Sequence, residues 1–142
     1  MGPVKAHRWL EFFGDVEKIF SASPHELKKA RLTPEQIDLV RKPDWAAAEK
    51  SLTWALKNHC QLIVFTDDLY PPLLREIHAA PLLFYLRGDT SLLSQPQLAM
   101  VGSRHASVMG LSQAKQFASE LASRGWVITS GMALGIDAAS HR

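Results

Sequence analysis

The stretch MVGSRHASVMG, residues 100–110, decides how this chain is organised. The apolar residues just before it are typical of a buried strand, and the pattern from about residue 107 to 124 indicates an amphipathic helix. Gly102, Ser103 and Arg104 therefore fall on a strand-to-helix turn. Such a turn directs unpaired backbone N–H groups and the positive end of a helix dipole towards one place. The stretch thus predicts a phosphate-binding loop on an α/β sheet.

A second turn of small residues follows the next predicted strand. Residues 126–129, WVIT, are typical of a strand, and SGMALGID follows at residues 130–137. A strand, a helix and a strand within about 30 residues form a βαβ unit, so strands 98–101 and 126–129 are predicted to be parallel neighbours. Both turns then lie at the carboxyl edge of the sheet, where open α/β sheets bind ligands.

The first 60 residues predict short helices joined by turns. Two helix starts have the pattern of a capping box with proline after the cap, at residues 23–26 (SPHE) and 33–36 (TPEQ). The four tryptophans are spaced as core residues. Two strands, 62–65 and 82–86, follow the helices and are separated by a proline-rich loop. We therefore expect a helical domain at residues 1–60 and a sheet domain at residues 61–142.

Composition limits the kind of binding site that this chain carries. The 142 residues are 46% apolar and 21% charged, which is an ordinary globular balance. The formal net charge is +2, and residues 61–142 carry six Lys and Arg against six Asp and Glu, so an anion site must be local rather than a broad basic face. A single cysteine and the absence of a CxxC pattern favour a reducing, cytoplasmic setting. The sequence contains no apolar run of the length that a signal peptide or a membrane span needs.

Three ordered motifs resemble the DprA/Smf family of DNA-processing proteins. These are VGSRHASVMG at 101–110, SGMALGIDAASH at 130–141, and DLYPPLL at 68–74 followed by PLLFYLRG at 81–88. The beginning of the chain, with GPVK and FFG within residues 2–14, is similar to the N-terminal SAM-like domain of that family. The resemblance implies an α/β protein with a SAM-like (helix–hairpin–helix-like) domain, followed by the first half of an extended Rossmann-like parallel sheet.

The resemblance also implies a function. Members of the family bind single-stranded DNA and load the RecA recombinase onto it during natural transformation. We therefore expect a cytoplasmic DNA-binding protein with single-stranded DNA and RecA as partners, a homodimer in its intact form, and no membrane association. The predicted sheet stops after two parallel strands, so we expect this chain to be a fragment of a longer protein.

No catalytic residue, metal or cofactor is expected. The two turns offer phosphate ligands, but they contain no acid–base pair, no metal-ligand spacing and no Walker lysine. The competing hypothesis is an enzyme that binds a nucleotide phosphate on a Rossmann-like sheet. The first turn reads GSRHAS rather than GxGxxG, and no acidic residue ends the second strand of the βαβ unit, where a ribose would be held. A third hypothesis is that residues 1–60 act alone as a cap that docks a protein.

Arg104 is the main candidate for DNA binding, because a guanidinium beside a helix N-terminus binds phosphate through two hydrogen bonds. The predicted phosphate ligands are Gly102, Ser103, Arg104, Ser107, Ser130 and Gly131. Gly110, Gly135 and Asp137 are predicted to support these turns structurally. Two alternatives stay open at this point. Arg104 could brace the turns through an ion pair with Asp137, and Ser107 could serve as a plain N-cap.

Overall fold

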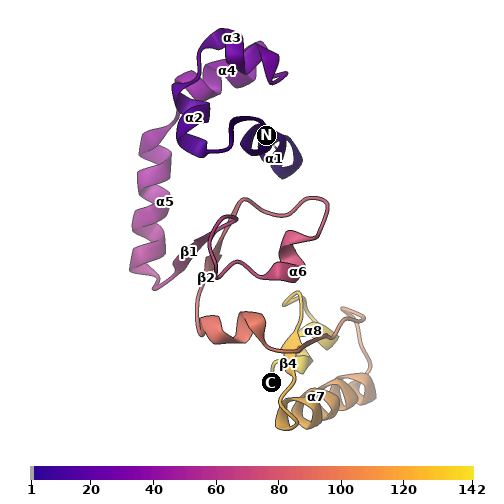
Figure 1. Cartoon of the computed structure of the whole chain (residues 1–142). Helices are drawn as coiled ribbons and strands as arrows, with labels where there is room; N and C mark the ends of the chain where they lie inside the picture. The colour runs from indigo at the N-terminus through magenta and orange to yellow at the C-terminus, as the bar shows by residue number, and fades with distance from the viewer. Residues whose placement is uncertain (1) are drawn as a thin grey trace. The chain divides into compact units, whose positions relative to one another are not determined.

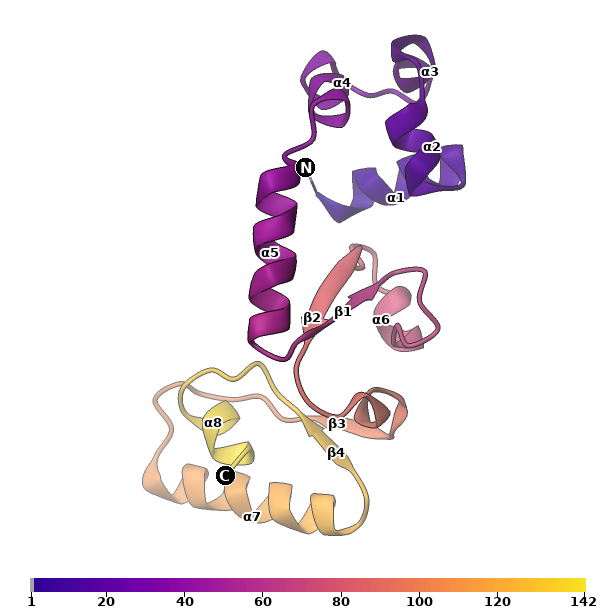
Figure 2. The ribbon, with the colours of Figure 1, turned by 90° about the vertical axis from the view of Figure 1, so that its left-hand side faces the viewer.

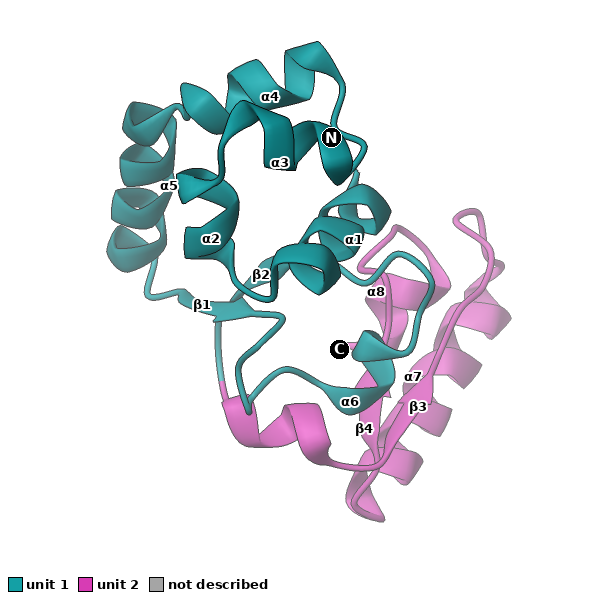
Figure 3. Ribbon diagram, turned by 45° about the horizontal axis from the view of Figure 1, so that its top comes forward, with its two compact units in different colours: residues 1–88 teal, residues 89–142 magenta. Residues whose placement is uncertain are grey.

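The computed structural model describes residues 2–142 as a mixture of helices and small sheets. The chain divides into two compact units, residues 1–88 and 89–142, which are coloured separately in Figure 3. The domain boundary expected after residue 60 coincides with the change from helices to strands at β1 (Gln61–Val64). A separate domain that begins there stays a prediction. Within residues 2–142, no helix combines the length and the apolar character needed to cross a membrane.

In the part of the chain that the structure describes, five helices precede the first strand: α1 (Pro3–Phe13), α2 (Val16–Ser21), α3 (Pro24–Lys29), α4 (Pro34–Arg41) and α5 (Trp45–Lys57). These helices are labelled in Figure 1. Both predicted capping boxes are confirmed. At the first, the Ser23 hydroxyl accepts from the Glu26 amide at 3.3 Å, and the Glu26 carboxylate accepts from the Ser23 amide at 2.8 Å. Gly14 ends α1 with a left-handed φ of 79°. Local sequence signals therefore determine where these helices begin and end.

The helical core is small, and only one tryptophan belongs to it. Trp9 is 5% exposed and packs in a cluster with Ile19, Ala22, Leu27, Leu32 and Val40. The prediction of a core role is wrong for Trp45, Trp54 and Trp126, which are 66%, 53% and 42% exposed. Helix α5 buries Ala55 instead, and the stripe that carries Trp45 stays exposed; the helix is drawn in Figure 2. An apolar period shows which residues share a face, but the packing of neighbouring elements decides which face is buried.

Strands β1 and β2 (Leu83–Leu86) pair antiparallel, with Gln61 opposite Leu86. The expectation of one parallel sheet is therefore wrong for this pair. A parallel pair needs a crossover that returns the chain to the same end of the sheet, usually through a helix. The 65–82 connection contains only the short helix α6 (Pro72–Arg75) and packs around the buried Tyr70. The Tyr70 hydroxyl donates to the Pro81 carbonyl at 2.8 Å.

The second unit contains the predicted βαβ arrangement. Its elements are the 3-10 helix η1 (Thr90–Ser94), β3 (Gln97–Ala99), α7 (Val108–Ser123), β4 (Val127–Thr129) and α8 (Ile136–Ser140). Strands β3 and β4 are parallel neighbours, as predicted, with Leu98 opposite Ile128. Helix α7 lies beside α8 (Figure 2) and buries Ala114 and Ala118. This arrangement places the two small-residue turns directly after β3 and β4.

Candidate functional site

The two turns interlock through two glycines. The amide of Ile136 donates to the carbonyl of Ser103 at 3.2 Å, which joins the second turn to the first. Gly135 has a φ of +82°, and a Cβ there would overlap the carbonyl oxygen of Ser103. A Cβ on Gly102 would lie 2.7 Å from Cγ1 of Ile136. Both positions therefore require glycine, because a side chain at either one would overlap atoms of the other turn.

Hydroxyl groups organise the first turn and the start of α7. The Ser103 hydroxyl accepts from the His105 amide at 3.1 Å. The Ser107 hydroxyl accepts from the Gly110 amide at 3.1 Å, which confirms the N-cap alternative for Ser107. A phosphate contact by Ser107 stays a prediction, since its hydroxyl proton is not used in the cap. A Cβ on Gly110 would meet its nearest atom, the Ser107 hydroxyl oxygen, at 3.4 Å.

Several backbone donors on these turns are left for a ligand. Within residues 2–142, no hydrogen bond uses the amides of Gly102, Ser103 or Arg104 on the first turn. The same holds for Gly131 and Met132 on the second turn, and all five residues are exposed. Consecutive free N–H groups at the carboxyl edge of a parallel sheet form an anion-binding surface.

The Arg104 side chain is exposed and forms no ion pair or hydrogen bond with residues 2–142. The alternative ion pair with Asp137 is therefore not formed. Asp137 is only 7% exposed, and its Oδ2 lies 3.2 Å from where a Cβ on Gly131 would stand. The carboxylate thus packs beneath the second turn, and the guanidinium of Arg104 is available to an anion.

The Ser130 side chain points away from the surface of the turn. Its hydroxyl oxygen is buried and has no hydrogen-bond partner within residues 2–142. Because a buried hydroxyl cannot reach a phosphate, only the backbone of Ser130 is placed to contact one. A role for Ser130 in DNA binding stays a prediction, as it does for the other proposed ligands.

A cavity of about 480 Å³ opens between α7 and α8 beside Arg104. Lys115 and Arg142 also line it, together with His105, and its apolar wall includes Leu111 and Leu134. Sequence reasoning missed Lys115 and Arg142. A signal for Lys115 was present, because residues 107, 111 and 115 recur every four positions and therefore share one face of the helix that begins at the phosphate turn.

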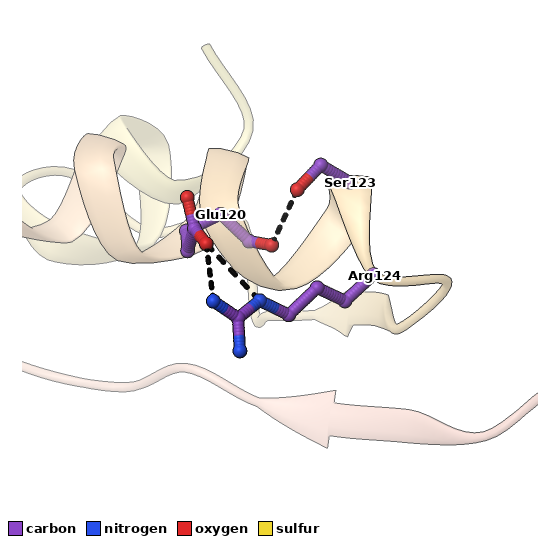
Figure 4. Close-up of polar contacts among 3 residues, drawn as sticks. All are labelled: Glu120, Ser123 and Arg124. Atoms are coloured by element: carbon purple, nitrogen blue, oxygen red, sulfur yellow. Dashed lines mark hydrogen bonds and ion pairs between the residues drawn. The ribbon is translucent and has the colours of Figure 1, made fainter.

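The remaining arginine of this unit, Arg124, forms an ion pair with Glu120. Figure 4 shows Arg124 at the far end of α7, where its guanidinium donates twice to the Glu120 carboxylate at 2.6 and 3.0 Å. Within residues 2–142, no group of three or more His, Cys, Asp or Glu side chains is placed to hold a metal ion. The free amides of the two turns and the exposed guanidinium of Arg104 are the groups that can bind an anion.

Comparison with known proteins identifies the family of this chain. The model of the DNA recombination-mediator protein A family matches residues 61–142. Protein Smf of Escherichia coli (strain K12) is 38% identical over 94 residues, which are 66% of this chain and 25% of Smf. DNA processing protein DprA of Streptococcus pneumoniae is 43% identical over 75 residues, which are 53% of this chain and 26% of that protein.

A solved structure extends the similarity to the helical part. The X-ray structure of DNA processing protein A (DprA) from Streptococcus pneumoniae matches with a TM-score of 0.75 at 27% sequence identity, covering 98% of this chain and 47% of that chain. This chain spans about a quarter of the length of the curated relatives Smf and DprA. The family model covers more than half of the chain, including both turns. The chain therefore belongs to the DNA recombination-mediator protein A family, which includes the DprA and Smf proteins.

Proposed function

We propose that this chain carries part of a single-stranded DNA-binding site, and that the turns at residues 102–104 and 130–131 hold the DNA backbone. The observation that carries the proposal is the unpaired Arg104 on two interlocked turns with free amides. A guanidinium and backbone N–H groups together match the charge and the acceptor geometry of a phosphate. The similarity to DNA processing proteins supports DNA as the source of that phosphate.

Binding of this kind has a recognisable signature. Contacts to phosphate position a strand but read no bases, so we expect little sequence preference. Each neutralised phosphate releases counterions, so affinity should fall as salt rises. The unit carries few cations, which makes the contribution of each one measurable.

For the intact protein we propose the role that the family resemblance implies. It takes part in DNA processing, protects incoming single-stranded DNA and loads RecA during natural transformation, as a cytoplasmic homodimer without enzymatic activity. We further propose that residues 1–60 form a SAM-like domain, and that residues 61–142 begin a Rossmann-like domain. The names of the relatives and the order of the motifs support this proposal.

The test is the replacement of Arg104 by alanine. We expect Arg104→Ala to weaken binding of a fluorescent oligothymidine, and to lower the slope of log K against log salt by roughly 0.7 for one lost phosphate contact. Fluorescence anisotropy across a salt series measures both, in this chain and in a longer natural form. Arg124→Ala is the matched control, because that side chain is tied to Glu120. An unchanged affinity and slope in Arg104→Ala would contradict the proposal.

A further inference from the structure

We infer that the groove between α7 and α8 holds one nucleotide of the bound strand. Lys115 and Arg142 contact its phosphate, and Leu134 contacts its base. The inference rests on the proposed function. It adds to the predicted site Lys115 and Arg142, which lie outside the two turns, and Leu134, which lies within the second turn but is not a predicted phosphate ligand. The occupant follows from the charge, the size and the apolar wall of the groove.

The charged side chains that line the groove are all cationic. Residues 89–142 contain four Lys and Arg and three Asp and Glu, so the net charge of the unit is only +1. Arg124 is paired with Glu120, and the other three cations all line this one cavity. None of the three side-chain carboxylates lines it. A concave surface lined by positive charges concentrates the electric field and favours the binding of an anion.

The cations of the groove are free to bind. Arg104, Lys115 and Arg142 are exposed, and none of them forms an ion pair within residues 2–142. Lys115 lies seven residues into α7, which is about 10 Å along the helix from its first residue. A strand that is held at Arg104 and runs along α7 passes over the groove before it reaches Lys115. The groove continues the proposed backbone path instead of forming a separate site.

The size and the apolar wall favour a nucleotide over a bare phosphate ion. The volume of about 480 Å³ lies in the range of small-molecule sites. Leu134 is 76% exposed, although it lies beside three cations that would favour a polar neighbour. Contact with a base would remove this apolar surface from water. A nucleotide matches both parts of the groove, because its charged phosphate pairs with the cations and its planar base packs on the apolar wall.

The experiment separates the charge from the apolar wall. Lys115→Gln, Arg142→Gln and their double variant are titrated by anisotropy against an oligothymidine of about 12 nucleotides, within the usual range of single-strand sites. A short Gly-Ser extension after Arg142 moves the terminal carboxylate away from the groove. Because both cations contact one phosphate, we expect the double variant to lower the salt slope by roughly 0.7 and each single variant to lower it by less. Lys115→Arg should retain the slope, and Arg124→Gln is the neutral control.

Leu134→Ser tests the base contact. We expect it to weaken binding of oligothymidine about fivefold without changing the salt slope, because an uncharged contact is lost. An abasic strand of the same length should bind Leu134→Ser and the parent chain equally. If the abasic strand loses the same affinity, the assignment of Leu134 to the base is wrong.

The outcomes distinguish this inference from the function on which it rests. If the Lys115 and Arg142 variants keep the parental slope while Arg104→Gln lowers it, the groove is not part of the path and the proposed function stands. If the parent chain and its longer form do not bind oligothymidine at low salt, the proposed function is wrong, and so is the inference about the groove. Far-UV circular dichroism confirms that each variant is folded, as expected for exposed side chains without hydrogen bonds.

Discussion

Gly135→Ala should be the most damaging single-methyl change in the second unit. Gly135 has a φ of +82° and a ψ of −126°, a conformation that side chains rarely adopt and that costs about 1–3 kcal/mol. The added Cβ would also lie 2.8 Å from the carbonyl oxygen of Arg104 and closer still to that of Ser103. Relief of the clash separates the turns and breaks the Ile136–Ser103 hydrogen bond, which contributes about 0.5–1.5 kcal/mol. We therefore expect a loss of about 2–4 kcal/mol.

Hydrogen exchange measures this loss locally. The Ala139 amide donates to the Gly135 carbonyl at 3.0 Å, and the Met100 amide to the Thr129 carbonyl at 2.9 Å, so both report on the turns. Their exchange should be about 30-fold to 1,000-fold faster in Gly135→Ala. Gly110→Ala is the matched control, because its Cβ meets only ordinary contacts and alanine favours a helix. Equal exchange rates in Gly135→Ala and the parent chain would refute the steric argument.

Three further predictions concern other contacts. Gly102→Ala should destabilise the second unit by about 2 kcal/mol through its clash with Ile136, and in denaturation experiments the loss in a double variant with Ile136→Ala should be smaller than the sum of the two single losses. Tyr70→Phe should lower the free energy of unfolding by about 1 kcal/mol, since it removes the hydrogen bond from the buried Tyr70 side chain to the Pro81 carbonyl; a loss below about 0.3 kcal/mol would contradict this role. Hydrogen bonds from the side chain and then the backbone of Ser23 hold the pKa of Glu26 below its ordinary 4.5. The resulting stabilisation is present above the unfolded-state pKa and is lost as the pH falls through the folded pKa, so Ser23→Ala should raise the pKa of Glu26 in an NMR titration.

Sequence reasoning succeeded where the signal is local. Ser23 and Thr33 start helices because the cap, the proline and the third residue lie within one turn of the chain. The parallel pairing of β3 and β4 was predictable as well, because a single helix of ordinary length joins them. These features depend on neighbouring residues and on chain connectivity, and a sequence contains both.

Sequence reasoning failed where contacts join distant segments. The antiparallel pairing of β1 with β2 depends on a long connection that packs around Tyr70. The exposure of Trp45 depends on which face of α5 finds a neighbour. Lys115 and Arg142 lie 27 positions apart, and only the packing of α7 on α8 brings them to one groove. The four-residue period of positions 107, 111 and 115 indicates a shared helix face, but no period or motif indicates which distant residue lies opposite that face.

The interlock of the two turns has a consequence for binding kinetics. Because Gly102 and Gly135 let the turns touch, and the Ile136 amide joins them, the donors are held in place before a ligand arrives. A preorganised site loses little conformational entropy when it binds. Encounter with a strand should therefore be limited by diffusion and charge rather than by a rearrangement of the turns. Differences in affinity among strands should then appear mainly as differences in residence time.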